Sequence, residues 1–148
     1  DNPFLKQVKA YAEKEGSLVI AISAKIEEEL VQLSEEESSE FLKELGLKEP
    51  GLNRLIRTSF DTLDLITYLT TGEQETRAWT IKKGTNAQEA AGKIHGDIQK
   101  GFIRAEVVSF ADMVTYNGRA RAKEAGKAKA EGKDYIVQDG DVILFYHN

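Results

Sequence analysis

The stretch that decides the fold reads ITYLTTGEQETRAWTI and occupies residues 66–81. Residues 66–71 and 76–81 are rich in β-branched and aromatic side chains, which favour strands. Gly72 and the three polar residues after it form a short link between the two runs. The pattern predicts a β-hairpin across residues 66–81.

The residues after this hairpin alternate between helix and strand signals. Thr85 or Asn86 can cap a helix that runs to about Lys100, and residues 103–110 are strand-like. Residues 118–132 are rich in Ala, Lys, Arg and Gly, which predicts a solvated loop with a helical turn. Residues 135–137 and 142–146 flank Asp139-Gly140, which predicts a closing hairpin. The order β-β-α-β-loop-β-β is typical of a β-grasp domain, a mixed sheet wrapped over one helix.

The residues before the hairpin predict three helical regions and one strand. Asn2 and Pro3 start a helix that ends near Gly16, and apolar residues recur at helical spacing across 26–45 and 52–63. The continuous apolar run at 18–22 is typical of a strand covered on both faces. A single strand cannot pair its own edges, so we expect its neighbours in residues outside this chain, in a partner chain, or in a second copy. The fold class is therefore α+β, and we expect the chain to be part of a longer protein.

Composition agrees with a globular protein rather than a disordered or membrane-embedded one. The 148 residues are 41% hydrophobic and 30% charged, with no cysteine and no apolar run of membrane-spanning length. We therefore expect a cytoplasmic protein without disulfides. Residues 1–65 carry a net charge of -6 and residues 66–148 carry +1, while residues 119–133 alone carry +4. Two units with different neighbours are expected.

No pattern in the sequence supports catalysis or metal binding by this chain alone. There is no cysteine, no nucleophile elbow and no Gly-x-x-x-x-Gly-Lys-Ser/Thr loop, and the two histidines, His95 and His147, lie far apart. The glutamate runs at 27–29 and 35–37 are typical of solvated helix faces. Ser23, Ala24 and Lys25 follow the predicted buried strand, where α/β sheets bind ligands. A small-residue turn with an ordinary surface lysine explains them equally well.

Several blocks resemble the YchF family of Obg-like ATPases and GTPases. Residues 18–27, LVIAISAKIE, resemble the fifth G-motif of translation-factor-class GTPases. The other blocks are GLNRLI at 51–56, AWTIKKGT at 78–85, GFIRAEV at 101–107 and GKDYIVQDGDV at 132–142. The resemblance covers nearly the whole chain.

This resemblance implies a longer parent protein that binds and hydrolyses ATP or GTP with Mg²⁺ and associates with ribosomes. Residues 1–65 would be the end of its P-loop nucleotide-binding domain, and residues 66–148 its ubiquitin-like TGS domain of β-grasp form. Ser23, Ala24 and Lys25 would border the purine base. The phosphate-binding loop, the magnesium-binding motif and the base-reading motif of the family do not occur in these 148 residues. Because phosphoryl transfer depends on those parts, we expect nucleotide hydrolysis by the parent but not by this chain alone.

Two functions remain open for the C-terminal part. The first is binding to the ribosome or to RNA phosphates without sequence specificity, because Lys and Arg neutralise phosphates. The candidate cations are Lys82, Lys83, Arg119, Arg121, Lys123, Lys127, Lys129 and Lys133. The second is a regulatory domain that binds a partner protein, or the parent's own nucleotide domain, and couples nucleotide state to that contact.

Overall fold

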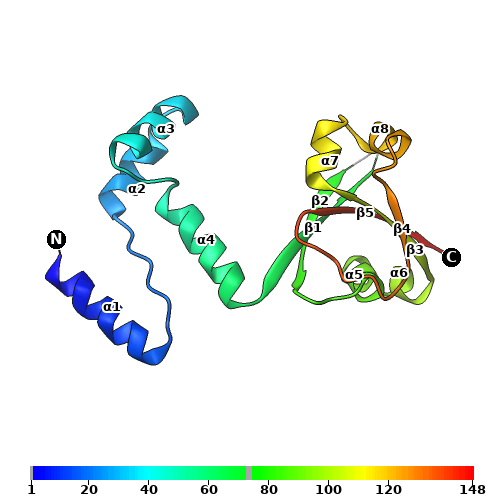
Figure 1. Cartoon of the computed structure of the whole chain (residues 1–148), viewed down its shortest axis with the longest axis horizontal. Helices are drawn as coiled ribbons and strands as arrows, with labels where there is room; N and C mark the ends of the chain where they lie inside the picture. The colour runs from blue at the N-terminus through cyan, green and yellow to red at the C-terminus, as the bar shows by residue number, and fades with distance from the viewer. Residues whose placement is uncertain (1, 73–74) are drawn as a thin grey trace. The chain divides into compact units, whose positions relative to one another are not determined.

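The computed structural model describes residues 2–72 and 75–148, and these form two compact units, Asp1–Thr62 and Leu63–Asn148 (Figure 1). The predicted link of the first hairpin includes Glu73 and Gln74, which lie outside the described residues.

The C-terminal unit is built on a five-stranded sheet in the order β2-β1-β5-β3-β4. Its strands are β1 (Leu65–Thr71), β2 (Thr76–Lys82), β3 (Phe102–Ser109), β4 (Lys129–Glu131) and β5 (Asp141–His147). β1 pairs antiparallel with β2 in the register Leu65↔Lys82 to Thr71↔Thr76, which confirms the two strands of the predicted hairpin. β5 lies between β1, to which it is parallel, and β3, to which it is antiparallel.

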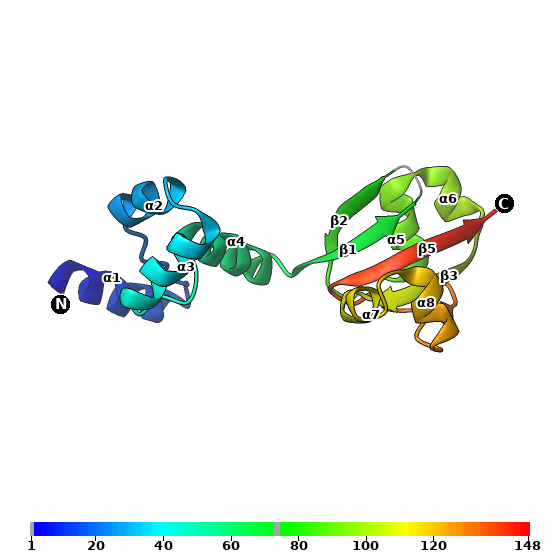
Figure 2. The ribbon, with the colours of Figure 1, turned by 90° about the horizontal axis from the view of Figure 1, so that it is seen from above.

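Helices cover both faces of this sheet. α5 (Ala87–Ile94) and α6 (Gly96–Lys100) lie on one face, and α7 (Phe110–Thr115) and α8 (Arg119–Glu124) lie on the other (Figures 1 and 2). On the α5 side, buried residues of β1, β3 and β5 pack with Ala87 and Ala90 to form the core. The Tyr68 hydroxyl donates to the Ala90 carbonyl at 2.8 Å, so the core includes one buried hydrogen bond between sheet and helix.

The predicted closing hairpin is wrong. Ile136 bridges to Asn86 instead of pairing with β5, and Val137 donates its N–H to Thr85. The turn itself forms, because the Asp141 carboxylate accepts from the Gln138 N–H at 2.9 Å and from the Tyr135 hydroxyl at 2.8 Å. These bonds direct residues 135–137 past the start of α5 and leave β5 free to enter the sheet beside β1.

Two other sequence predictions for this unit need correction. The helix that Asn86 caps stops at Ile94, and α6 begins after His95, whose backbone is extended. The helical turn expected at 118–132 is present as α8, but the segment is not a solvated loop, since Ala122 is fully buried and Lys129–Glu131 form β4. Alanine is small enough to let α8 lie close to the sheet, so small residues here indicate close packing rather than a lack of packing.

The N-terminal unit consists of α1 (Pro3–Glu15), α2 (Ala24–Val31), α3 (Glu35–Glu44) and α4 (Gly51–Thr62). Side chains of Asn2, Ser23 and Ser34 cap the first three helices. Residues 17–23 connect α1 to α2 without forming a strand, which corrects the strand predicted at 18–22. A strand needs a neighbouring strand to pair with, and the described residues of this unit supply none.

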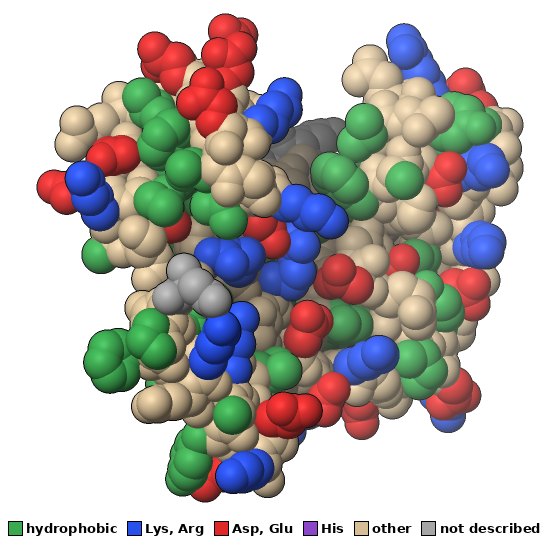
Figure 3. All heavy atoms as spheres, turned by 60° about the vertical axis from the view of Figure 1, so that its left-hand side comes forward, with side chains coloured by type: hydrophobic (Ala, Val, Ile, Leu, Met, Phe, Trp, Pro, Cys, Tyr) green, Lys and Arg blue, Asp and Glu red, His purple; other side chains and the backbone are tan. Residues whose placement is uncertain are grey.

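Several hydrophobic side chains of this unit are exposed to solvent. They include Phe4, Val8 and Tyr11 of α1, Leu18, and Leu52 and Ile56 of α4. In the left-hand part of Figure 3, hydrophobic side chains of the unit lie at the surface below a group of acidic ones. The longest helix among the described residues is α1, with 13 residues, so none of them reaches the length that crosses a bilayer.

Replacement of Tyr68 by Phe tests the buried bond between sheet and helix. The substitution leaves the Ala90 carbonyl without this partner, so we expect the free energy of unfolding to fall by about 1 kcal/mol. Urea denaturation followed by the fluorescence of Trp79, the single tryptophan, reports on this unit. Tyr116→Phe is the control, since the Tyr116 hydroxyl makes no hydrogen bond within the described residues. An unchanged Tyr68→Phe midpoint would contradict the account.

Candidate nucleic-acid interface

The cations predicted at 119–133 lie on α8, on the segment after it, on β4, and, for Lys133, in the turn that follows β4. Gly118 begins this region with a φ of 118°, a backbone conformation that side chains disfavour. Buried Ala122 holds α8 against the sheet, and Gly126, at a φ of 72°, ends the helix and turns the chain toward β4. The sequence thus places a short cationic helix on a sheet face and returns the chain at the edge.

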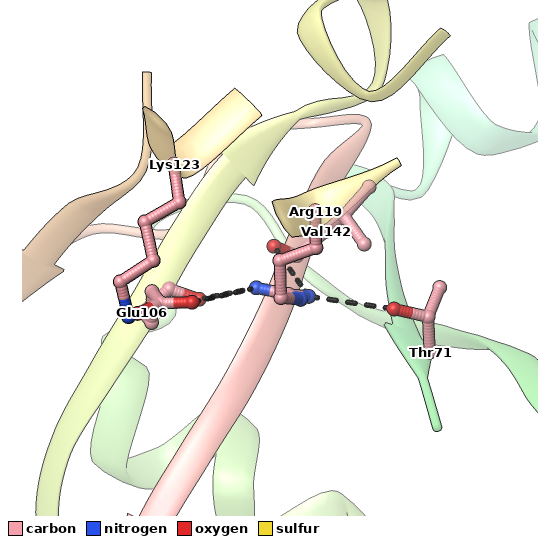
Figure 4. A network of polar contacts seen from close by, with 5 residues as sticks. All are labelled: Thr71, Glu106, Arg119, Lys123 and Val142. Carbon is pink, nitrogen blue, oxygen red and sulfur yellow. Dashed lines mark hydrogen bonds and ion pairs between the residues drawn. The ribbon is translucent and has the colours of Figure 1, made fainter. Parts of the chain in front are cut away.

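A single carboxylate of β3 holds this helix. Glu106 lies on the α8 side of the sheet, and its side chain is only 11% exposed. Lys123 Nζ lies 2.7 Å from Glu106 Oε2, and Arg119 Nη1 lies 3.6 Å from Glu106 Oε1. Figure 4 shows the two cations approaching the carboxylate from α8. A carboxylate so far removed from water requires such partners.

Arg119 also connects three strands. Its guanidinium donates to the carbonyl of Glu106 at 3.3 Å, to Thr71 Oγ1 at 3.4 Å and to the carbonyl of Val142 at 3.4 Å (Figure 4). These acceptors belong to β3, β1 and β5. The Arg119 side chain is only 18% exposed, and its hydrogen bonds link α8 to the sheet. Its geometry is that of a residue that positions α8 rather than one that reaches solvent.

The ion pairs shift the titration of both partners. The hydrogen bond from Lys123 is the main reason why the pKa of Glu106 is lowered, and the charges of Lys123 and Arg119 add to it against the opposing effect of burial. The same hydrogen bond to Glu106 raises the pKa of Lys123. Both groups are therefore charged at neutral pH.

The structure divides the eight candidate cations into three groups. Arg119 and Lys123 are paired with Glu106. Lys82 and Lys83 lie at the end of β2, the edge strand opposite β4. The third group is exposed and forms no ion pair within residues 2–72 and 75–148, and we call it the free cation group: Arg121, Lys127, Lys129 and Lys133.

Sequence reasoning missed Glu106, although one signal was available. In the strand sequence FIRAEVVS, Glu106 is the only acidic residue, and it lies between buried Ala105 and Val107. A carboxylate in the middle of a central strand needs a partner. The partner could not be identified from sequence, because α8 follows β3 only after another helix.

The three residues expected to border a nucleotide base lie at the start of α2. Ser23 is the N-cap, and its hydroxyl oxygen accepts from the Ile26 N–H at 3.4 Å. Lys25 is exposed. Beside them lies a cavity of about 290 Å³, lined by Ala21, Ile22, Ser23, Ile26, Glu27, Leu47 and Arg54. The backbone N–H groups in the first turn of α2 are the donors that a ligand could use here.

Side chains from α2 and α4 hold this cavity together. Glu27 Oε1 accepts from the Gly51 N–H at 2.7 Å, and Arg54 Nη2 donates to the Ala21 carbonyl at 2.8 Å. A Cβ on Gly51 would lie 2.7 Å from Glu27 Oε1, so a side chain at this position would displace the Glu27 carboxylate. No cluster of three or more His, Asp or Glu side chains suited to a metal ion occurs in the described part of the chain.

Replacement of Glu106 by Gln tests the ion pairs. Because the folded-state pKa of Glu106 is lowered, its charge stabilises the fold above the unfolded pKa, and that contribution is lost as pH falls through the folded pKa. We expect Glu106→Gln to lower the free energy of unfolding at pH 7 by about 2 kcal/mol. We also expect the free energy of unfolding of this variant to decrease less steeply than that of wild type as pH falls.

Trp79 fluorescence in urea at a series of pH values measures both effects. Glu89→Gln, on the exposed side of α5, is the control for removal of a carboxylate charge. Equal pH profiles for wild type and Glu106→Gln would show that the pairs contribute nothing.

Comparisons with known proteins identify relatives of this chain. A family model named YchF-GTPase_C, described as a protein of unknown function (DUF933), matches residues 65–148. The chain is 56% identical over all 148 residues to a protein of Escherichia coli O157:H7 named ribosome-binding ATPase YchF, and covers 41% of it. It is 52% identical over 147 residues to the protein of that name from Bacillus subtilis, and covers 40% of that protein.

A solved structure shows the same fold. The Schizosaccharomyces pombe YchF GTPase superposes with a TM-score of 0.82 at 36% identity, over 99% of this chain and 39% of that one. The chain thus spans about two-fifths of the length of these relatives. The matched domain and the identity over the whole chain place this protein in the YchF family, as the sequence motifs predicted.

Proposed function

We propose that the chain is the C-terminal part of a cytoplasmic, ribosome-associated regulatory protein that hydrolyses ATP or GTP, and that its C-terminal unit contacts RNA phosphates on the ribosome. The relatives' name, ribosome-binding ATPase, supports the first part. The second part rests on the cations of α8 and β4.

Strand order supports the proposal that residues 66–148 form a TGS domain of β-grasp type. A parallel pair, β1 and β5, lies at the centre of the sheet, hairpin strand β2 lies outside it, and α5 packs across one face. A mixed sheet with a helix across one face supports the β-grasp assignment. α7 and α8, on the opposite face of the sheet, are two helices in addition to those of the β-grasp arrangement.

The observation that carries the RNA proposal is the free cation group. Arg121, Lys127, Lys129 and Lys133 are exposed and lack carboxylate partners within the described residues, while Arg119 and Lys123 fix the helix from which the segment extends. Cations on a fixed support lose little conformational freedom when they meet phosphates. Their contacts would be to the backbone of RNA, which gives salt-dependent binding without sequence preference.

Residues 1–65 are proposed to be the end of a P-loop nucleotide-binding domain. The backbone N–H groups at Ser23, Ala24 and Lys25 would border the base, and the Glu27 and Arg54 contacts would hold that turn in place. The bound nucleotide would supply the phosphates for hydrolysis in the parent. The side chains near this turn do not offer the carboxylate set that Mg²⁺ prefers, so no metal step is assigned to them.

The exposed hydrophobic side chains of the N-terminal unit favour a second candidate function, a regulatory role in which this unit binds another protein surface. Phe4, Val8 and Tyr11 lie one turn apart on α1, and Phe4 is 73% exposed. An apolar stripe of this kind is normally buried against protein. The covering surface would be the parent's own nucleotide domain, a partner protein, or a second copy pairing through residues 18–22.

Ribosome co-pelleting over a salt series tests the RNA proposal. We expect the double variant Lys127→Glu/Lys129→Glu to bind about tenfold more weakly and to show a shallower dependence on salt, since two phosphate contacts are lost. Lys123 is left unchanged because it pairs with Glu106. Lys93→Glu/Lys100→Glu, on α5 and α6, makes the same charge change on the other face and should pellet as wild type does.

Two results would contradict this proposal. If the two double variants lose binding to the same extent, net charge alone drives the association. If the wild-type chain stays in the supernatant at low salt, the α8–β4 segment is not a ribosome contact and the protein-facing role is favoured.

A further inference from the structure

An arginine and a tyrosine stack on the sheet face that carries α8. Arg104 of β3 and Tyr146 of β5 are register partners, and the Arg104 Cζ atom lies 4.6 Å from the centre of the Tyr146 ring. Arg104 is exposed, and Tyr146 is partly so. A guanidinium group is planar, so one of its faces meets the ring while the other remains available.

Lys123 completes this cluster. Its ammonium group is 61% exposed and lies 2.7 Å from Glu106 Oε2, and Glu106 is two residues along β3 from Arg104. The Glu106 and Arg104 side chains therefore lie on the same face of the sheet. Arg119 and Lys123 pair with this one carboxylate, so the face that also carries Arg104 keeps a net positive charge.

We propose that Arg104, Tyr146 and Lys123 form a subsite for one unpaired nucleotide of single-stranded RNA. The base would stack on the free face of the Arg104 guanidinium, which Tyr146 supports from behind, and Lys123 would meet the adjacent phosphate. Unpaired bases stack on aromatic rings and on arginine planes in this way. This inference rests on the proposed RNA contact and specifies which kind of RNA the unit binds.

The arrangement favours a single strand over the other ligands that a basic surface attracts. The bases of a duplex are already stacked on one another, so a duplex would use only the cations. An acidic peptide would also use the cations and would gain little from the planar Arg104–Tyr146 stack. The stack and the neighbouring lysine together match a base joined to its phosphate.

The chain contains a matched control for this site. Arg77 and Trp79 of β2 form a second arginine–aromatic stack, with the Arg77 Cζ atom 4.3 Å from the ring centre. Trp79 packs against the core on the α5 side, and its Nε1 donates to Thr70 Oγ1 at 2.9 Å. Loss of Arg77 changes charge and stacking as loss of Arg104 does, but away from α8.

Fluorescence anisotropy of a labelled 12-nucleotide oligouridine with the 148-residue chain tests the proposal. We expect Tyr146→Leu to weaken binding about tenfold, because the support of one stacked base is lost. Its dependence on salt should match that of wild type, and Arg104→Gln should likewise weaken binding with little change in the salt slope, because Arg104 meets the base and not a phosphate. Arg77→Gln should bind as wild type does, and a 12-base-pair RNA duplex should bind Tyr146→Leu and wild type equally.

Photo-crosslinking gives a second readout that does not depend on the folding of a variant. An oligouridine carrying 5-iodouridine should form an adduct with the wild-type chain beside the stack, within β3 (Phe102–Ser109) or β5 (Asp141–His147), located by mass spectrometry. Adducts confined to other residues would overturn the proposal.

The remaining outcomes separate this inference from the proposed function. If the chain pellets with ribosomes through Lys127 and Lys129 but binds the oligouridine equally with and without Tyr146, the phosphate contact stands and the base subsite is refuted. If polyglutamate displaces the oligouridine and binds Tyr146→Leu as well as wild type, the surface is a site for acidic peptides. If the wild-type chain binds neither ribosomes nor oligouridine, both proposals fail.

Discussion

The carboxylate of Glu106 is the constraint on which the cationic face of this protein depends. It lies in a central strand and is nearly closed to water, where an unpaired charge would be strongly destabilising. Arg119 and Lys123 of α8 neutralise it, and Arg119 also bonds to acceptors on three strands. α8 is thereby held in one place on the sheet, and the free cation group takes its position from it.

Local signals were sufficient for much of the C-terminal unit. The hairpin at 66–81, the Asn86 cap and the strand near 103–110 all follow from residues within a few positions of one another. The closing strand could not be predicted this way. Asp139-Gly140 does form a turn, but hydrogen bonds of Asp141 and the bridge from Ile136 to Asn86 send the preceding segment away from β5. That choice depends on tertiary contacts between distant residues.

The candidate site shows the same division. The sequence identified the cations between Arg119 and Lys133, since a charge run is visible in any sequence. It could not separate those that face inward from those that face solvent, because the deciding residue is Glu106 on β3. The Arg104–Tyr146 pair was missed for a similar reason, as the two residues meet only when β3 and β5 pair.

In the N-terminal unit, the apolar run at 18–22 predicts a strand that the structure does not contain. Its apolar character is real, but no described strand of the unit is present to pair with it. The helix caps at Asn2, Ser23 and Ser34, by contrast, depend on neighbouring residues alone. The run is instead partly buried as a connection, with Val19 and Ile20 half-buried and Leu18 and Ile22 exposed.

Native-state hydrogen exchange most directly tests whether Glu106 fixes α8. The amides of Ala125, Gly126 and Lys127 close the end of that helix, and those of β1 report on the sheet. In wild type we expect both sets to exchange with similar opening free energies. In Glu106→Gln we expect the α8 amides to open more easily than those of β1. If the α8 and β1 amides keep similar opening free energies in the variant, Glu106 does not hold the helix. The same conclusion follows if the α8 amides are already poorly protected in wild type.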